Sequence, residues 1–328
     1  YKPELFVAFV MMSAVGVYYW RRTRSSFEAA FEAAWWVRIL FLVPLLAVLF
    51  IGIRSSFGHR AANISLASYT SSRLVNEVAK NSLFAIGYAY YSQKSHGSKM
   101  SGYGKMDMDE AYARVSKQLH IPVGDRNTPF FREQLSHFKS SKPKNLVIFV
   151  QESLGAQFVG ELSEEKGITP NIDRLSRESI FFDQVYSNGT RSVRGIAGST
   201  AGILAIPGKG VLKRNKSQSD FFTVASLLKP YGYHSSFIYG GESNFDNMRS
   251  WFLGNSFDEI IDQPKFEDPA FLGVWGVCDE DLVKRANREF TRHHANSEPF
   301  VSVLFSTTNH TPFEFPEGRI DLIEGEPT

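Results

Sequence analysis

The residues of this chain that could do chemistry follow short apolar runs, at the points where buried strands are expected to end. Glu152 comes directly after the run at residues 145–150 (NLVIFV). Because the carboxyl ends of strands face the ligand crevice of an open α/β sheet, a carboxylate there is well placed to bind a cation. Position alone gives equal weight to the alternative that Glu152 caps the next helix.

A second polar segment, residues 187–195 (SNGTRSVRG), combines hydroxyls with two arginines and two glycines and leads into a stretch of small residues. A hydroxyl nucleophile at a helix start gains from the positive end of the helix dipole, which stabilises an alkoxide and the phosphate that it attacks. Arg191 and Arg194 offer forked donors for a phosphoryl group. A capped turn with solvated arginines explains the same residues at least as well.

Two later apolar runs end in the same way. Residues 235–239 lead into a block that begins with two glycines (GGESNFDNM), and residues 300–305 lead into STTNHTPF, which contains His310. Any one of these polar side chains could be structural. Their joint occurrence at one sheet edge favours a functional site.

A sheet and several helices must position these blocks. The apolar runs predict strands, the first of them covered on both faces, and the segments between them have helical spacing. Thr169 and Pro170 mark the start of one of these helices, as N-cap and first helical residue. The alternation predicts an α/β domain with a doubly wound, parallel-rich sheet. The expected strands are residues 145–150, 180–186, 235–239 and 300–305, and the expected helices are residues 170–180, 222–228 and 279–293.

Two apolar segments precede this domain. Residues 5–20 are nearly uncharged and close with aromatic residues, and residues 35–53 approach the roughly 20 residues that a bilayer core demands. The arginine cluster RRTR at residues 21–24 lies between them, so the positive-inside tendency places that loop in the cytoplasm and everything after Arg54 outside. Buried helices of a soluble protein are the alternative, but they rarely carry aromatic residues and arginines at their boundaries.

Three regions are therefore predicted. Two transmembrane helices with a short cytoplasmic loop occupy residues 1–54, an amphipathic helical linker occupies residues 55–140, and the catalytic domain occupies residues 141–328. Within the linker, residues 61–91 are expected to form one long helix and residues 106–119 another.

The composition of the 328 residues excludes some classes of function. Lys plus Arg number 36 and Asp plus Glu 34, and the resulting net charge of +2 gives no whole-chain electrostatic case for binding nucleic acid. Cys278 is the sole cysteine. One chain can therefore form neither an internal disulfide nor a cysteine-based zinc site or redox pair.

The polar blocks resemble those of the sulfatase-like alkaline phosphatase superfamily in their order, their spacing and their chemistry. The resemblance covers this chain from about residue 145 to the C-terminus. The most similar branch is the membrane-anchored lipoteichoic acid synthase and phosphoglycerol transferase type. The resemblance implies an alkaline-phosphatase-like sheet sandwiched by helices, in a multi-pass protein of the bacterial cytoplasmic membrane with its catalytic domain on the outer face. The blocks are NLVIFVQES, TPNIDRLSRESIFFDQVYSNGTRSVRG, YGGESNFDNM and TTNHTPF.

The resemblance also implies roles for residues. A glutamate after the first strand binds metal in that branch, which implies this role for Glu152. The nucleophile is a hydroxyl residue that also touches the metal; spacing from Tyr186 favours Ser192, and Thr190 is the alternative because the related enzymes generally use threonine. His310 matches a histidine that binds the substrate phosphate. The implied substrate contacts of the tyrosine-glycine-glycine block are Glu242, Phe245, Asp246 and Asn247.

The reaction implied is transfer of a phosphoglycerol or phospholipid headgroup through a covalent phospho-Ser or phospho-Thr intermediate. The divalent metal is expected to be manganese, with magnesium, zinc and calcium as alternatives. The donor would be an anionic glycerophospholipid and the acceptor a hydroxyl of a glycan or growing polymer. The alternatives are a phosphodiester or sulfate ester hydrolase of the same superfamily and a catalytically silent membrane sensor that binds lipid. Residues 192–196 (SVRGI) lack the third-position Pro or Ala and the following Arg of true sulfatases, which disfavours sulfate hydrolysis.

Two features suggest a piece of a longer protein. The chain begins with Tyr1 in place of Met, and the family's later aspartate-histidine metal pair has no match after His310. We therefore expect half a metal site, a catalytic domain that lacks its C-terminal part, and little turnover by the chain as it stands.

Overall fold

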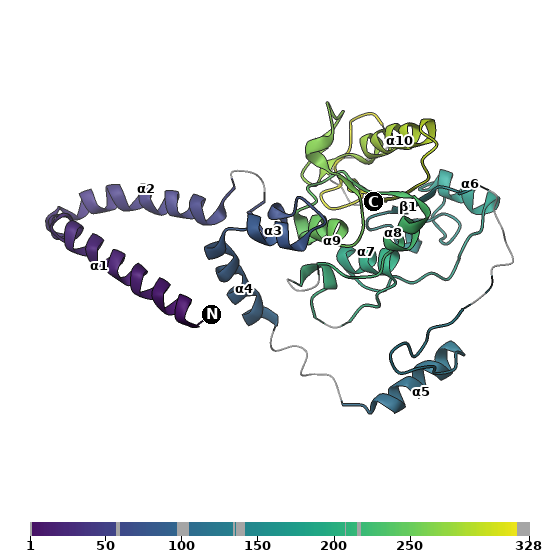
Figure 1. The fold of residues 1–328 in the computed structure, drawn as a ribbon. Helices are drawn as coiled ribbons and strands as arrows, with labels where there is room; N and C mark the ends of the chain where they lie inside the picture. Colours follow the sequence, from purple (N-terminus) through teal and green to yellow (C-terminus); the bar gives the residue numbers. More distant parts are fainter. Residues whose placement is uncertain are drawn as a thin grey trace. The chain divides into compact units, whose positions relative to one another are not determined.

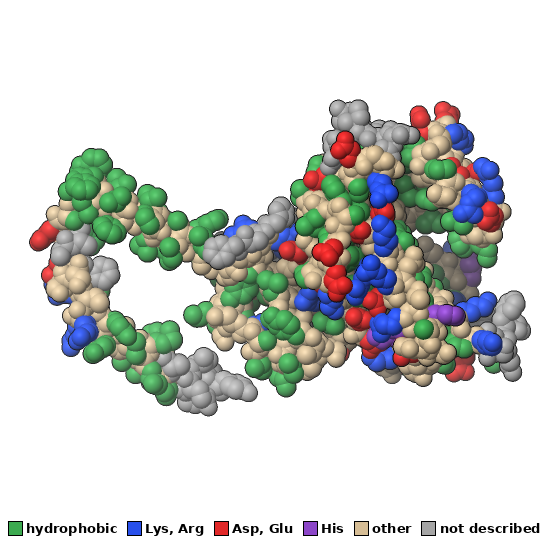
Figure 2. Space-filling model, turned by 90° about the horizontal axis from the view of Figure 1, so that it is seen from above, with side chains coloured by type: hydrophobic (Ala, Val, Ile, Leu, Met, Phe, Trp, Pro, Cys, Tyr) green, Lys and Arg blue, Asp and Glu red, His purple; other side chains and the backbone are tan. Residues whose placement is uncertain are grey.

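The chain divides into two compact units, residues 1–62 and 63–328, in a computed structural model. Hydrophobic side chains cover much of the visible face of the two helices of the first unit, whereas charges of both signs interleave on the second (Figure 2). The residues described are 2–56, 60–96, 105–133, 135, 142–206, 208–214 and 218–319.

The first unit consists of α1 (Lys2–Glu32) and α2 (Trp35–Arg54). The length and hydropathy of α2 are those of a membrane-crossing helix, and none of its residues is buried. In the described part of the chain no other helix meets both criteria. Residues 5–20 lie within α1, and the two-span topology stays a prediction.

A four-stranded parallel sheet organises the second unit, in the order β1-β6-β2-β3. In register, Val303 of β6 lies between Ile148 of β1 and Phe237 of β2. The predicted α/β architecture, a parallel sheet flanked by helices, is confirmed. The strands are β1 (Leu146–Val150), β2 (His234–Tyr239), β3 (Glu259–Ile261) and β6 (Phe300–Phe305).

Alternate residues of the central strands point to opposite faces of the sheet and form two cores. Phe237 and Val303 belong to the larger core, which α7, α8 and α9 cover, and Ile238 and Leu304 belong to the smaller one, beneath α10. Figure 1 shows the sheet between α10 and these three helices. The helices are α7 (Ser192–Ala201), α8 (Val224–Leu228), α9 (Met248–Gly254) and α10 (Asp279–Ala295).

β1 differs from the prediction of a strand covered on both faces. Val147 and Phe149 are 44% and 43% exposed, whereas every residue of β6 is buried. β1 is the edge strand of the described sheet, and the α10 core that covers the same face includes residues of β2, β3 and β6 but none of β1. The prediction was wrong because a continuous apolar run does not reveal whether its strand lies at an edge.

Residues 180–186, predicted as a strand, form none. They pair with no strand among the residues that the structure describes, and Ile180 and Tyr186 are 85% and 86% exposed. The preceding helix, α6 (Pro170–Glu178), begins at Pro170 as predicted. The side chain of Thr169 does not cap it, because Thr169 Oγ1 instead accepts from Gly160 N at 3.0 Å and contacts Asp173.

The linker is not the single helix predicted for residues 61–91, which was wrong. Asn63 Oδ1 accepts from Ser65 N at 2.9 Å and Ser72 Oγ accepts from Val75 N at 3.5 Å, so polar side chains start new turns within that stretch. The predicted helix at residues 106–119 is present as α5. The segments are η1 (Ile64–Ala67), α3 (Arg73–Ala79), α4 (Ser82–His96) and α5 (Met108–Leu119). The domain boundaries at residues 54 and 140 stay predictions.

Several short elements complete the described chain. Two of them, β4 and β5, form an antiparallel hairpin apart from the main sheet. The elements are η3 (Ala156–Phe158), η4 (Val211–Lys213), η5 (Lys229–Tyr231), η6 (Phe245–Asn247), η7 (Gln263–Lys265), β4 (Leu272–Gly273) and β5 (Gly276–Val277).

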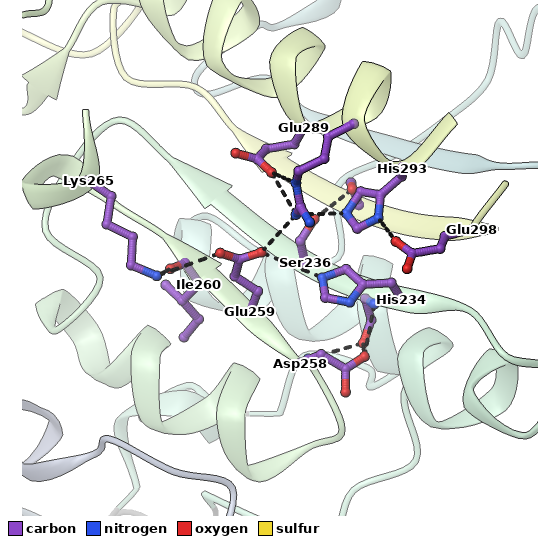
Figure 3. A network of polar contacts seen from close by, with 12 residues as sticks. His234, Ser236, Asp258, Glu259, Ile260, Lys265, Glu289, His293 and Glu298 are labelled. Atoms are coloured by element: carbon purple, nitrogen blue, oxygen red, sulfur yellow. Dashed lines mark hydrogen bonds and ion pairs between the residues drawn. The ribbon is translucent and has the colours of Figure 1, made fainter. Parts of the chain in front are cut away.

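At the amino ends of the strands, two histidines and several carboxylates form a cluster (Figure 3). The rings of His234 and His293 stack with centroids 4.5 Å apart. Glu298 Oε2 lies 3.0 Å from His293 Nδ1, and Glu259 Oε2 lies 3.6 Å from His234 Nε2. His234 lowers the pKa of Glu259, with help from Lys265 and Arg292, and His293 lowers the pKa of Glu298.

This cluster predicts loss of stability in acid. Because the pKa of Glu259 is lower in the folded chain than its ordinary value of 4.5, its contribution to stability is present above that value and disappears as pH falls through the folded-state pKa. We expect the free energy of unfolding of the full chain to fall between about pH 5 and pH 3, and to fall less steeply in Glu259→Gln. Denaturant titrations at each pH measure this, with the exposed Glu165→Gln as control. If the free energy of unfolding fell equally steeply with pH in Glu259→Gln and in Glu165→Gln, the prediction would be wrong.

Candidate active site

Glu152 and Ser192 meet at the carboxyl edge of the sheet. Ser192 Oγ donates to Glu152 Oε2 at 2.8 Å, and Ser153 Oγ donates to Glu152 Oε1 at 3.0 Å. Glu152 follows β1 and Ser192 is the first residue of α7, so a carboxylate and a hydroxyl face each other where the positive end of a helix dipole lies. The sequence predicted that these two side chains would converge.

The loop after β6 holds Glu152 in place. Glu152 N donates to Ser306 Oγ at 2.7 Å, and Asn309 Nδ2 donates to the Glu152 carbonyl at 3.1 Å. Ser306 N donates to the Val150 carbonyl at 3.2 Å, which extends the pairing of the two strands by one residue. The loops that follow β1 and β6 therefore form one hydrogen-bonded unit.

The turn before Ser192 packs closely on α7. Asn188 Nδ2 donates to the Ile203 carbonyl at 2.9 Å. The Asn188 side chain lies against Gly198 of α7, where a Cβ would be 2.3 Å from Nδ2. Only glycine leaves room for this contact. It fixes the start of α7, and with it the position of Ser192.

Ser192 and Glu152 line a cavity of about 100 Å³. Its other polar and charged walls include Arg191, Lys213, Asp246 and His310. Lys213 Nζ forms an ion pair with Asp246 Oδ1 at 2.7 Å. Two cations, two carboxylates and an imidazole thus surround a space suited to a small anionic group.

Aromatic rings form another wall. Trp275 contacts Phe245 edge-on, with centroids 5.7 Å apart, and tilts against His310 at 4.1 Å. Trp275 Nε1 donates to the Thr311 carbonyl at 2.8 Å, and His310 Nδ1 lies 2.9 Å from the same oxygen. Because that carbonyl can only accept, Nδ1 carries a proton and leaves Nε2 as the nitrogen that can accept one.

The position of Trp275 depends on a glycine at the end of β2. A Cβ on Gly241 would lie 2.5 Å from the Trp275 carbonyl oxygen, so the β4–β5 hairpin could not approach if another residue stood there. Sequence reasoning missed both Trp275 and Lys213. The paired glycines after β2 were a usable sign that another segment approaches there, but nothing local marks Lys213.

The structure brings some of the predicted site residues together and leaves others apart. Thr190 is exposed and outside the cavity lining, and Glu242 is also outside it. Arg194 Nη2 donates to the Gly208 carbonyl at 2.7 Å, and Asn247 Nδ2 donates to the Leu212 carbonyl at 3.2 Å. The predicted residues that line the cavity are Glu152, Arg191, Ser192, Phe245, Asp246 and His310.

Asp279, the first residue of α10, holds the segment that leads to His310. Its Oδ1 accepts from Thr307 N at 2.7 Å and from Thr308 N at 3.3 Å, and Asp279 N donates to Thr308 Oγ1 at 2.9 Å. Burial raises the pKa of Asp279, and the hydrogen bonds from these threonines offset part of the rise.

This arrangement separates the effects of two substitutions. Asp279→Ala leaves two amides without their acceptor and should lower the free energy of unfolding by about 1–3 kcal/mol. Asp279→Asn keeps an acceptor and removes the buried charge. The pKa of Asp279 is higher in the folded chain than in the unfolded one, so at pH values above the unfolded-state pKa the ionised carboxylate lowers the free energy of unfolding. Asp279→Asn should therefore be at least as stable as the parent near pH 7. Denaturant unfolding of both variants measures their free energies of unfolding. An equal decrease in Asp279→Ala and Asp279→Asn would contradict the prediction.

The site can be compared with known proteins. The family model described as Sulfatase matches residues 144–320, more than half of the chain. A solved structure of a protein in the alkaline phosphatase superfamily from Vibrio parahaemolyticus is 46% identical, with a TM-score of 0.64, over 68% of this chain and 55% of that one. The lipoteichoic acid synthase LtaP from Listeria monocytogenes shares the fold, at 22% identity and a TM-score of 0.52, over 65% of this chain and 50% of that one.

Two curated relatives agree with these matches. The lipoteichoic acid synthase-like protein YvgJ of Bacillus subtilis (strain 168) is 26% identical over 56% of this chain, and phosphoglycerol transferase I of Escherichia coli (strain 55989 / EAEC) is 22% identical over 65% of it. This chain spans 29% of the length of each. The resemblance predicted from the four blocks is confirmed, and the chain belongs to the sulfatase family.

Proposed function

We propose that this chain is the site-bearing part of a membrane-anchored phosphoglycerol transferase that acts through a covalent bond between phosphorus and Ser192. The hydrogen bond between Ser192 Oγ and Glu152 Oε2, in a cavity that also holds Arg191 and Lys213, carries the proposal. A hydroxyl at a helix N-terminus, beside a carboxylate and two cations, suits attack on a phosphoryl group. The names of the relatives YvgJ and phosphoglycerol transferase I support the same class of reaction.

The reaction would proceed in two displacements. The hydroxyl of Ser192 loses its proton to water, its Oγ attacks the phosphorus of a phosphodiester, and the bond from phosphorus to the diacylglycerol oxygen breaks. That oxygen takes a proton, and diacylglycerol leaves. A hydroxyl of a glycan or growing polymer then attacks the phosphorus and gives up its proton, the bond to Ser192 breaks, and Oγ is protonated again.

A divalent cation is part of this proposal. In the described part of the chain no three His, Cys, Asp or Glu side chains are grouped closely enough to bind one. Glu152 and Ser192 nevertheless place two oxygen atoms 2.8 Å apart, and hard cations such as Mn²⁺ and Mg²⁺ prefer oxygen ligands. These two residues would hold the cation, which would favour the ionised serine and polarise the phosphodiester.

The remaining cavity residues would bind and orient the substrate. Arg191 and Lys213 supply positive charge for the phosphoryl oxygens. Nε2 of His310 is free to orient the acceptor hydroxyl, since Nδ1 is bonded to the Thr311 carbonyl. Trp275 and Phe245 offer ring faces to the glycerol carbons.

We also propose a lipid donor and a cellular location, which the apolar N-terminal unit supports. Because α2 is long and apolar enough to cross a bilayer, the proposed donor is an anionic glycerophospholipid of the same membrane. We place the protein in the bacterial cytoplasmic membrane with its site on the outer face, since the arginines of residues 21–24 favour the cytoplasmic side.

Release of diacylglycerol tests the function. The transferase that contains this chain, reconstituted in bilayers of labelled phosphatidylglycerol with Mn²⁺, should release diacylglycerol and transfer phosphoglycerol to an added glycan or polyol. Release with free glycerol phosphate as the sole second product would instead indicate a hydrolase. Binding of the lipid without release would indicate a silent sensor, and either result would reject the transferase.

A further inference from the structure

The segment that follows the first unit packs directly on one wall of the cavity. Asn63 Nδ2 donates to the Asn244 carbonyl at 2.6 Å, just before Phe245 and Asp246, which line the cavity. Ile64 is 8% exposed and Ser65 is fully buried. We call residues 63–68 the strut and residues 243–248 the site loop.

The site loop has a backbone that needs support. Asp246 and Asn247 have φ of 53° and 63°, so two successive non-glycine residues adopt the left-handed conformation. Such residues persist where the surroundings hold them. Asn247 is held through its bond to the Leu212 carbonyl, and Asp246 through its ion pair with Lys213. The bond from Asn63 to the Asn244 carbonyl holds the other end of the turn.

The strut also caps the helix that follows the site loop. Asn247, the residue before α9, makes no side-chain capping bond, because its amide reaches Leu212. Ser65 Oγ accepts from Ser250 N at 3.1 Å and so satisfies an N–H of the first turn of α9 from outside the helix. Ser68 Oγ lies 2.6 Å from Ser250 Oγ, and the three hydroxyls form one buried cluster.

We propose that the strut is a positioning segment that sets the conformation of the site loop, and so of the Phe245–Asp246 wall of the cavity. Residues 55–62 alone connect it to α2, so the chain that leaves the apolar helix would hold part of the substrate site. Its effect on substrate rests on the proposed function, whereas its effect on the loop does not.

Amide hydrogen exchange of the full chain in bilayers, without substrate, tests the strut. Asn63→Ser keeps an oxygen that can accept from Ser65 N but cannot reach the Asn244 carbonyl, and Ser65→Ala removes the acceptor for Ser250 N. Both should speed exchange in peptides covering residues 243–250 roughly fivefold or more, while β6 keeps its protection. Asn76→Ser is the matched control, since among the described residues the Asn76 side chain bonds only within residues 69–76.

Unchanged exchange at residues 243–250 in both variants would overturn the proposal, and so would equal acceleration in β6, which would indicate general destabilisation. In the proposed reaction, Asn63→Ser should raise KM for the lipid several-fold with kcat little changed, because Ser192 and Glu152 are untouched. A fall in kcat alone would contradict the positioning role. Exchange needs no substrate, so failure of the proposed reaction leaves that test intact.

Discussion

Ser192→Ala is expected to lower the release of diacylglycerol by roughly a thousandfold or more, because loss of a covalent nucleophile leaves only binding and electrostatic stabilisation. The structural basis is the position of Ser192 at the start of α7, with its Oγ 2.8 Å from Glu152 Oε2. Release from labelled lipid by the reconstituted transferase that contains this chain measures the effect. Acid quenching of the parent during turnover should yield a phosphoglycerol adduct on the peptide that contains residue 192.

Two further variants make this result specific. Ser199→Ala, on the same helix, removes a hydroxyl whose bonds within the described part of the chain go only to α7 carbonyls, and release should be unchanged. Thr190→Ala should also have little effect, because Thr190 is exposed and outside the cavity lining. If Thr190→Ala abolished release while Ser192→Ala retained it, Thr190 would be the nucleophile.

Removal of the divalent cation is the second change with a large expected effect. Chelation should reduce release to background, and added Mn²⁺ should restore it, because the proposed cation favours the ionised Ser192. Glu152→Gln should raise the Mn²⁺ concentration that gives half-maximal release by roughly 10- to 100-fold or more. Loss of a residue that merely hydrogen-bonds to a metal ligand already lowers metal affinity by that factor, and Glu152 is proposed as a ligand itself. The exposed Glu164→Gln should behave like the parent. Release that persists after chelation would refute metal dependence.

The sheet and the central pair of the site could be predicted because their signals are local. β1, β2 and β6 are continuous apolar runs, and the polar residues that follow a parallel strand must lie at its carboxyl end. Glu152 therefore had to lie at this edge once the sheet was assumed. Ser192 follows no strand of the described sheet, and the order of the family blocks is what predicted its place beside Glu152. The spacing from Tyr186 favoured Ser192 as the nucleophile, with Thr190 as the alternative.

Other features depend on contacts that no local pattern contains. Residues 180–186 have the composition of a strand, but a strand also needs a pairing partner, and none of the described strands provides one. Lys213 reaches the cavity because Asn247 holds the Leu212 carbonyl, more than 30 residues away in sequence. Residues 61–91 show helical spacing, yet Asn63 and Ser72 bond backbone amides and divide the segment.

The bonds between the loops after β1 and β6 have a consequence for biosynthesis. Glu152 depends on Ser306 and Asn309, which lie more than 150 residues later. A nascent chain that has not yet reached β6 possesses both Ser192 and Glu152 but lacks the strand that aligns them, and contacts between such distant residues form late in folding. Unfinished chains would therefore lack an assembled candidate site until the last strand of the described sheet is in place.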